Sequence, residues 1–482
     1  MSLSGFVRKI KALEVLSSEQ VEEIHKSILD TLENTGVRFE YDKALKIFKK
    51  NECNVNFDTK IVKFPSGIVE ELLRKVPSSF TVKSRDPKNN IRIGGNTLFF
   101  APMPGMHTID LATWKSRPAT LEENKQALIV MDALENLHIL SSYTPYFEIE
   151  GVPPAMAIPK SFAEKIKYSS KVSWEGYQNN CEIFVIEMSK VVNQDTIGIC
   201  LPSAPLAYYS DACESGIRFA EACLPVNIAN APVMGGTSPV TIAGSLVTFF
   251  AEAIAGILLL QLVKPGTSIM LEGALLQMNM KTGAPIFNSV SNCLFMVAFI
   301  QLCRKYGIPS VSDTGWTNSK KIDFQNGYER TINTIIMAQA GCNIIILHGG
   351  IYAELVHHPI QSILDDDIAG MVGKFIQGFD VTTDKLAVDL INNVGPIPGH
   401  FLNTSHTRQY YKEEGFLPKC SDFLTYPEWE KNGFRDSIDL AKERLEKILS
   451  GHQPVTLTDD QDNEIEKILK KARSYYEDNG LL

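Results

Sequence analysis

The sequence predicts an α/β fold, namely a TIM (β/α)8 barrel with an N-terminal α+β appendage and a C-terminal helical extension. Two observations predict it. Short, almost continuously apolar runs recur along residues 97–350, and helical stretches separate them. Such runs are typical of parallel strands that are buried on both faces. About eight strand-and-helix units that close on themselves form a barrel of roughly 250 residues, which matches the length of this stretch.

Eight short apolar runs are predicted as the barrel strands: Thr97–Ala101, Leu137–Ser142, Lys171–Trp174, Ile197–Leu201, Val226–Asn230, Ser268–Glu272, Ser310–Asp313 and Asn343–His348. Helices are predicted between them, at Leu121–Leu134, Thr241–Val263, Phe287–Tyr306 and Tyr328–Gln339. The rival fold is an open doubly wound sheet, but its Gly-x-Gly-x-x-Gly fingerprint at the first strand-to-helix turn is absent. The closed barrel is therefore favoured.

Three regions are predicted along the chain: 1–95 as the appendage, 96–375 as the barrel, and 376–482 as an extension that wraps the barrel. In the first region, a capping box at Ser17 and Gln20 begins an amphipathic helix that ends at Gly36. Further helices are expected at 41–50 and 66–76, with strands at 80–82 and 91–93. Two amphipathic helices, 436–449 and a helix capped at Thr458, close the chain.

Charge and composition argue against several functions. The 482 residues are 44% hydrophobic and carry 47 Lys+Arg against 56 Asp+Glu, and the net charge of −9 does not favour a nucleic-acid ligand. The N-terminus has no signal-peptide pattern, and Glu252 interrupts the most apolar run, 243–263. The nine cysteines form no Cys-x-x-Cys pair and are expected to be buried and reduced. We expect a cytoplasmic protein that binds neither nucleic acid nor membrane.

The carboxyl ends of the predicted strands carry the residues that line the active site in a barrel. These positions are rich in aromatic and acidic side chains and lack Lys and Arg; the candidates are Tyr143, Trp174, Glu272, Asp313, Trp316, His348, Gly349, Gly350 and Tyr352. Aromatic faces beside carboxylates hold quaternary ammonium groups, because the ring quadrupole attracts a cation that has no N–H to donate. The alternative is that each ring is half-buried packing at the barrel mouth.

Patterns for metal and nucleophile sites are missing. No His or Cys pair has the spacing of zinc ligands on one strand or helix face, so no metal site is predicted, although a site assembled from distant residues stays open. The run 365–367, three aspartates, is expected to open a helix rather than to bind a cation. The Gly-x-Ser-x-Gly motif is absent. For His348, a satisfied core role and a functional role both stay open.

Several motifs resemble the trimethylamine methyltransferase superfamily. They are Asp313-Thr314-Gly315-Trp316-Thr317-Asn318-Ser319-Lys320, Asp323-Phe324-Gln325-Asn326-Gly327-Tyr328-Glu329, Pro202-Ser203-Ala204-Pro205-Leu206, Gln261-Leu262-Val263-Lys264-Pro265-Gly266, Gly399-His400-Phe401-Leu402 and Ser405-His406-Thr407. The likeness runs from about residue 10 to 475. It implies a TIM barrel that moves a methyl group from an amine to the cobalt of a corrinoid on a separate protein. Members that act on trimethylamine carry pyrrolysine near the stretch after Leu347, where this chain has His348-Gly349-Gly350-Ile351. The departure points to the non-pyrrolysine branch, the glycine betaine-type corrinoid methyltransferases.

The resulting hypothesis is a methyltransferase that moves a methyl group from a quaternary amine to Co(I). Glycine betaine is the first substrate expected, with proline betaine and carnitine as alternatives. A quaternary ammonium already leaves as a neutral tertiary amine, so alignment and desolvation are the remaining tasks. The hypothesis assigns catalytic roles to His348, Asp313 and Glu272, and substrate binding to Tyr143, Trp174, Trp316, Gly349, Gly350 and Tyr352. Asp313 or Glu272 would balance the cation, while His348 and glycine amides would take a betaine carboxylate.

No cofactor is expected to be bound in this chain. Base-off corrinoid carriers resemble one another in an Asp-x-His-x-x-Gly motif that no histidine here has, so a cognate corrinoid protein must supply cob(I)alamin. We also expect a homo-oligomer. Two alternatives stay open: a non-catalytic barrel that binds betaine or docks a corrinoid protein, and a zinc-dependent corrinoid methyltransferase, which would need a thiolate–histidine site that the sequence does not display.

Overall fold

The computed structural model describes residues 4–482, and its centre is a curled sheet of eight parallel strands. The first three residues of the stretch considered for a signal peptide lie outside the described residues. In chain order the strands are β7 (Thr97–Pro102), β10 (Ile139–Leu140), β11 (Val172–Glu175), β12 (Thr196–Cys200), β14 (Val226–Asn230), β16 (Ile269–Gly273), β19 (Ser310–Asp313) and β20 (Ile344–His348). All eight lie where the apolar runs predicted them. A short ninth strand, β1 (Phe6–Val7), pairs antiparallel with β7.

The two ends of the parallel sheet approach each other. β20 pairs with β7, so that the last parallel strand lies beside the first. At the opposite end, the backbone N–H of His138, directly before β10, donates to the carbonyl of Phe100 in β7 over 2.8 Å. The hydroxyl of Ser141 beyond β10 donates to the carbonyl of Pro102 over 2.5 Å. The predicted α/β class, with a curled parallel sheet and surrounding helices, is confirmed.

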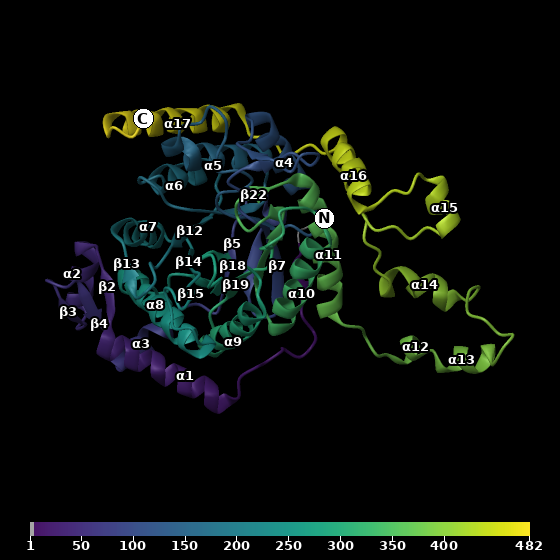
Figure 1. Cartoon of the computed structure of the whole chain (residues 1–482), viewed down its shortest axis with the longest axis horizontal. Helices are drawn as coiled ribbons and strands as arrows, with labels where there is room; N and C mark the ends of the chain where they lie inside the picture. The colour runs from purple at the N-terminus through teal and green to yellow at the C-terminus, as the bar shows by residue number, and fades with distance from the viewer. Residues whose placement is uncertain (1–3) are drawn as a thin grey trace.

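A helix follows each of the eight strands and covers the outer face of the sheet (Figure 1). The helices are α4 (Leu121–Ala133), α5 (Ala157–Tyr168), α6 (Glu182–Val191), α7 (Ser210–Glu221), α8 (Ile242–Val263), α9 (Val290–Tyr306), α10 (Phe324–Ala340) and α11 (Pro359–Gln377). Two of these begin at other residues than expected. The side chain of Ser289 caps α9, and that of Asp323 caps α10 by accepting from the backbone N–H of Asn326.

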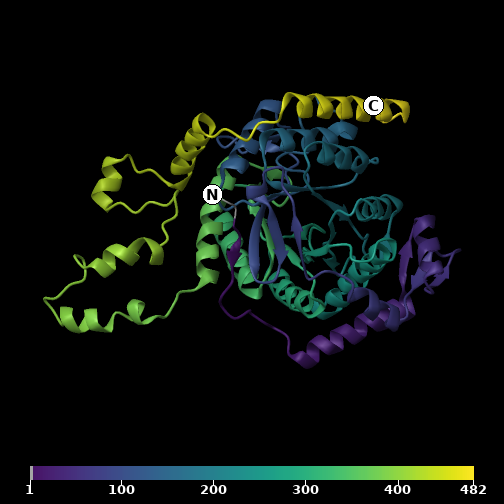
Figure 2. The same cartoon turned by 180° about the vertical axis from the view of Figure 1, so that it is seen from behind.

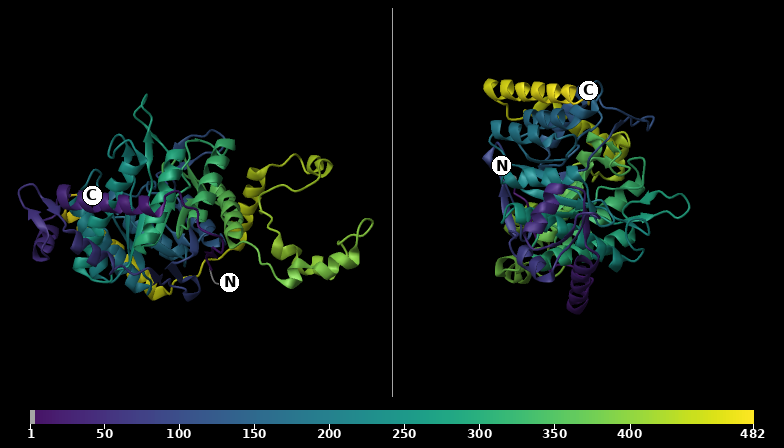
Figure 3. Two further views of the ribbon diagram at one scale, coloured as in Figure 1. Left: turned by 90° about the horizontal axis from the view of Figure 1, so that it is seen from below. Right: turned by 90° about the vertical axis from the view of Figure 1, so that its left-hand side faces the viewer.

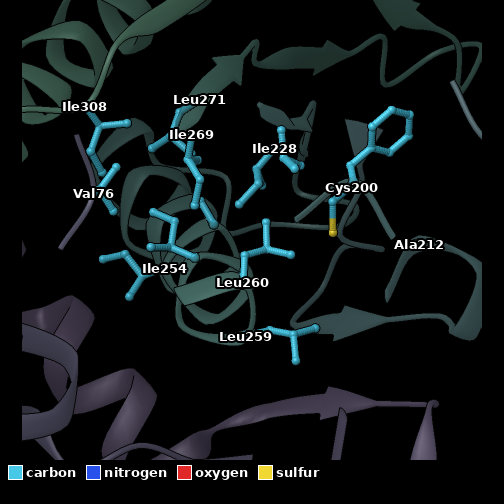
Figure 4. Close-up of a cluster of buried hydrophobic side chains, with 14 of the residues drawn as sticks. Val76, Cys200, Ala212, Ile228, Ile254, Leu259, Leu260, Ile269, Leu271 and Ile308 are labelled. Carbon is cyan, nitrogen blue, oxygen red and sulfur yellow. The ribbon is translucent and has the colours of Figure 1, made fainter. Parts of the chain in front are cut away.

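The largest hydrophobic layer lies between the sheet and the helices. Figure 4 shows Ile254 and Leu260 of α8 facing Ile228 of β14 and Leu271 of β16. Each such side chain contributes about 1.5–3 kcal/mol when it is fully buried. Helix α8 is long and apolar enough to cross a membrane by composition alone, but most of it is buried inside the protein, as expected of a core helix. This layer fixes the strands whose carboxyl ends form the site below.

The N-terminal region packs in two parts: residues 18–76 pack on the outside of α8, with a core continuous with that of the helix layer, whereas residues 79–94 pack against the apolar cluster on the inner side of the curled sheet. It comprises α1 (Ser18–Asp30), a π-helical turn η1 (Thr31–Thr35), α2 (Asp42–Lys50), α3 (Ser66–Leu73), β2 (Val37–Phe39), β3 (Asn54–Asn56), β4 (Ile61–Lys63), β5 (Ser79–Val82), a 3-10 turn η2 (Pro87–Asn89) and β6 (Ile91–Gly94). The predicted capping box at Ser17 is present. Gly36, with φ +79°, ends the helical segment as expected.

Short strands and one further turn lie in the loops around the sheet: β8 (Thr108–Ile109), β9 (Ser116–Arg117), η3 (Pro154–Met156), β13 (Ala207–Tyr208), β15 (Val233–Met234), β17 (Leu276–Met278), β18 (Pro285–Ile286), β21 (Gly350–Ile351) and β22 (Val356–His357). β17 and β18 form an antiparallel hairpin, and β15 pairs with β17. In the left view of Figure 3, a teal loop of this region projects from the body. These pairs build up the rim around the carboxyl ends of the barrel strands.

The C-terminal region divides into two parts. Helix α16 (Ser437–Gly451) packs against α4 and α11, and α17 (Asp459–Asp478) packs against α5 and α6. The helices α12 (Thr383–Leu386), α13 (Val388–Val394), α14 (Ser405–Glu414) and α15 (Tyr426–Lys431) of the segment 379–435 stand away from the body (Figures 1 and 2). Between α14 and α15 the segment returns to the body, where Asp367 of α11 accepts from the backbone N–H groups of Lys419 and Cys420. Of the C-terminal helices, α16 and α17 lie on the body, and α12 to α15 do not.

The three aspartates 365–367 do not open a helix, so that expectation was wrong. Helix α11 begins at Pro359, and the aspartates are buried in its interior. Asp365 pairs with Arg330 of α10, and Asp366 accepts from Arg444 of α16 over 2.7 Å. Their charges are balanced by the buried Arg330 and the half-buried Arg444 from distant parts of the chain, rather than by the dipole of a helix N-terminus.

Candidate functional site

A cavity of about 430 Å³ lies at the carboxyl ends of the parallel strands. Small-molecule sites typically measure about 300–1,000 Å³. Residues on or just beyond every one of the eight strands line it: Pro104, Ser141, Ser142, Tyr143, Trp174, Ile199, Leu201, Pro202, Ala204, Ala229, Asn230, Ala231, Val233, Thr237, Glu272, Asp313, Trp316, Ile346 and Glu354. A curled parallel sheet brings these strand ends together although they are far apart in sequence.

Five of the nine residues predicted from strand ends line this cavity, namely Tyr143, Trp174, Glu272, Asp313 and Trp316. The other four, His348, Gly349, Gly350 and Tyr352, are not in its wall. The ring of Tyr352 instead has the ammonium group of Lys320 4.2 Å from its centre.

His348 is buried on the outer side of the sheet. The register of β20 against β7 shifts between Ile346 and His348, so the regular alternation of side chains is interrupted there. Ile346 lines the cavity, whereas the imidazole of His348 lies against Phe100, with ring centres 6.1 Å apart, and 3.9 Å from Asp366 of α11. Burial lowers the pKa of His348 well below its usual range, so the ring is neutral.

Two carboxyl groups, the half-buried Glu272 and the buried Asp313, lie on the neighbouring strands β16 and β19. The two groups hydrogen-bond each other, and Asn227 donates its amide N–H to Glu272. Burial raises the pKa of Glu272 to about 7. Burial and the adjacent Glu272 raise the pKa of Asp313 well above its usual range. The pair therefore holds at least one proton near neutral pH as long as no cation is nearby.

Glu354 is a third carboxyl group in the cavity that the sequence analysis missed. It lies between β21 and β22, two short strands that fold the loop after β20 back over the cavity. Desolvation at the cavity wall raises the pKa of Glu354, although the residue keeps an exposed surface, and its charge in turn raises the pKa of both Glu272 and Asp313. The sequence could have pointed to Glu354 through its position in the loop after the last predicted strand, because the loops that follow barrel strands face the active site.

Aromatic rings form the wall beside these carboxyl groups. Trp174 and Trp316 are buried, and the Trp316 ring meets Phe287 edge to face with centres 5.4 Å apart. Asn288 donates its side-chain N–H to the backbone carbonyl of Trp316 and so fixes the loop after β19. Tyr143 has a φ of +55°, a strained conformation for a residue other than glycine. Strain of this kind is common where a side chain must be held in a binding site.

Buried ion pairs support the loops around the cavity. Lys165 of α5 pairs with Glu175 over 2.5 Å and donates to the carbonyl of Ser141 over 2.7 Å. Arg330 of α10 is fully buried and pairs with Asp365. It also donates to the backbone carbonyls of Gly315, Leu347 and Gly350, and so ties the loops after β19 and β20 together.

The charge of the cavity is one-sided. Three carboxyl groups, Glu272, Asp313 and Glu354, line it, and no Lys, Arg or His among residues 4–482 does. Over the same residues, no group of three or more His, Cys, Asp or Glu side chains is arranged to hold a metal ion. Carboxylates beside aromatic faces attract an organic cation, and they repel anions. The arrangement therefore fits a small ligand that carries an ammonium group.

Comparison with known proteins places these features in a family context. The family model for trimethylamine methyltransferase (MTTB) matches residues 1–475. The chain is 31% identical to a glycine betaine methyltransferase of Desulfitobacterium hafniense (strain Y51), over 94% of this chain and 96% of that protein. It is 29% identical to the trimethylamine methyltransferase MttB of D. hafniense (strain DSM 10664 / DCB-2), over 96% and 93% of the two chains. In fold it resembles the crystal structure of the hydroxylamine complex of MtmB, with a TM-score of 0.50, 12% identity, and coverage of 90% and 93%.

Proposed function

The chain belongs to the trimethylamine methyltransferase (MTTB) family, and we propose that it transfers a methyl group from a quaternary amine to the Co(I) of a separate corrinoid protein. The observation that carries this proposal is the cavity with three carboxyl groups, two tryptophans and no basic side chain among the described residues. A permanently charged ammonium group is the ligand that this combination favours. We propose further that the eight parallel strands form a closed TIM barrel; the His138 to Phe100 hydrogen bond supports this.

The residues of this chain would bind and align the amine. The rings of Trp174 and Trp316 would contact its methyl groups, while Glu272, Asp313 and Glu354 would balance its charge. The transfer moves one methyl carbon to cobalt, which supplies the electron pair of the new bond. The electrons of the broken C–N bond stay on nitrogen, and a neutral tertiary amine leaves. No proton has to be donated, so protein groups contribute through alignment and exclusion of water.

The charge of the cavity also bears on which quaternary amine is accepted. Glycine betaine is expected from the family resemblance, and the sequence assigns its carboxylate to His348 and the amides of Gly349 and Gly350. Those groups are outside the cavity wall, and the carboxyl groups inside it would repel a substrate carboxylate. We therefore propose that the preferred substrates carry the ammonium as their only charge, as choline and tetramethylammonium do. Glycine betaine is the alternative, supported by its methyltransferase at 31% identity.

Titration calorimetry tests this preference. Choline should bind at least tenfold more tightly than glycine betaine, because glycine betaine adds a carboxylate. Choline should also bind at least tenfold more tightly than 3,3-dimethylbutanol, which has the same shape without the positive charge. Glycine betaine binding the most tightly would reject the charge argument and leave the methyltransferase proposal intact. Equal binding of choline and its neutral analogue would count against the cation site itself.

The affinity for a quaternary ammonium should depend on pH in a defined direction. A bound cation favours the ionised carboxylates, so binding must release the proton that Glu272, with a pKa of about 7, holds in the free protein. Affinity for choline is therefore expected to rise about tenfold from pH 6 to pH 8. Calorimetry in buffers of different ionisation enthalpy measures the proton release directly. A constant affinity with no proton released would contradict the shared-proton carboxyl pair.

A further inference from the structure

The segment 379–435, here called the arm, lacks a hydrophobic core of its own. None of its four helices, α12, α13, α14 and α15, has a buried residue. These helices have 4, 7, 10 and 6 residues, and isolated helices of such length are marginal in water. Polar contacts attach the arm at its base, where Lys9 pairs with Asp380, and at one stretch between its helices, where Asp367 of α11 accepts from the backbone N–H of Cys420. The arm therefore needs a surface to lie on.

The outward-facing side chains of the arm are strongly apolar. Of the 34 large hydrophobic residues that are exposed among the described residues, 15 lie in this segment. Ile397 is 94% exposed and Leu402 is 83% exposed. At the size of large apolar side chains, the arm exposes roughly 1,000 Å² of such surface, more than monomers normally leave uncovered and enough for one side of a stable interface.

The body of the same chain offers a matching apolar face. Phe324, Tyr328 and Ile332 lie at every fourth position along α10, and all three are exposed. Val290 and Leu294 extend this face on the neighbouring α9, and Met371 and Phe375 extend it on α11. We call these seven residues the helix face. A stripe at this spacing on a barrel helix normally packs against another element. Here no element within residues 4–482 covers it.

We propose that the arm of one chain lies on the helix face of a second copy, with the exchange made in both directions. One chain supplies both the uncovered arm and the uncovered face, which is the requirement for a self-complementary two-fold interface. The arm leaves α11 at the side of the body, whereas the cavity lies at the carboxyl ends of the strands (Figure 3). A corrinoid protein has to approach the cavity, so the arm is free to serve the second copy.

Light scattering coupled to size exclusion tests the proposal on the full-length protein. The wild type should have twice the chain mass of 53.6 kDa, or a higher even multiple. Ile397→Glu combined with Leu402→Glu should give monomers with unchanged circular dichroism, because both side chains are exposed in the single chain. Phe324→Glu on the helix face should also give monomers with unchanged circular dichroism. Phe57→Glu, an exposed apolar residue of the N-terminal region, should leave the oligomer intact.

Mixing the two monomeric variants distinguishes the proposed contact from other interfaces. The intact arm of the Phe324→Glu chain can lie on the intact face of the arm variant, so the mixture should recover dimers in part. A monomeric wild type, or an arm variant that keeps its oligomeric mass, would overturn the proposal. So would an arm variant that stays oligomeric yet loses binding of the corrinoid protein, because the arm would then serve that partner.

Discussion

Converting both Glu272 and Asp313 to their amides should lower the affinity for a quaternary ammonium by about a hundredfold, equivalent to roughly 2.7 kcal/mol. Glu272→Gln and Asp313→Asn keep the shape of the wall and remove the negative charge that balances the substrate cation. Because the amine would no longer be held against the tryptophans, the rate of methyl transfer should also fall by at least about a hundredfold. Calorimetry with choline measures the first effect.

The fold should survive this double change. Both carboxyl groups have pKa values raised by burial in the folded protein. The wild type therefore loses folding stability as the pH rises from the unfolded pKa of about 4 to the folded pKa, because the groups must then ionise inside the protein. At pH 8 the double variant should melt at the same temperature as the wild type or higher. Glu182→Gln is the matched control, since Glu182 is a buried carboxyl group with a raised pKa on α6, outside the cavity. It should change stability through Arg218 and leave affinity unchanged. Undiminished choline binding by the folded double variant would show that the pair is not the counter-ion.

Replacing Arg330 by methionine should cost about 3–5 kcal/mol of folding free energy. The change leaves the buried Asp365 without its partner and removes the donor to three backbone carbonyls. For a chain of this length, about 2.1 cal/mol/K of unfolding entropy per residue converts the loss to a melting temperature lower by roughly 3–5 °C.

The control for Arg330→Met is Arg473→Met, which removes the exposed pair with Glu477 on α17 and should cost less than about 1 kcal/mol. The double change Arg330→Met with Asp365→Leu should recover part of the stability, because no unpaired charge stays buried. An Arg330→Met protein that melts with the wild type would show that the loops after β19 and β20 are held by other contacts.

The strands were predictable from sequence because a parallel strand buried on both faces is apolar at every position, as in the run Ile344–Leu347. Strand ends then predicted Glu272, Asp313 and Trp316 for the cavity, since the curled sheet brings such ends together. The position of His348 outside the cavity was not predictable from sequence, because it depends on a register shift between β20 and β7 that leaves no local sequence signal.

Other features depend on partners that are distant in sequence. The aspartates 365–367 read as a helix start until Arg330 and Arg444 are seen to pair with them from two other helices. Glu354 reaches the cavity only because β21 and β22 fold its loop back. The arm has helical segments like those of a packed extension, and only their lack of buried residues shows that they stand apart.

A single-turnover assay tests the central claim most directly. The full-length protein is mixed with choline, tetramethylammonium or glycine betaine and a corrinoid protein reduced to Co(I), and the absorbance change to methyl-Co(III) is followed together with the amine product. We expect one equivalent of demethylated tertiary amine for each methyl-cobalt formed, with the fastest transfer from an amine that lacks a carboxylate. Tight binding of a quaternary amine without any methyl transfer, using a corrinoid protein that accepts methyl groups from a related enzyme, would contradict the account and show a barrel that only binds.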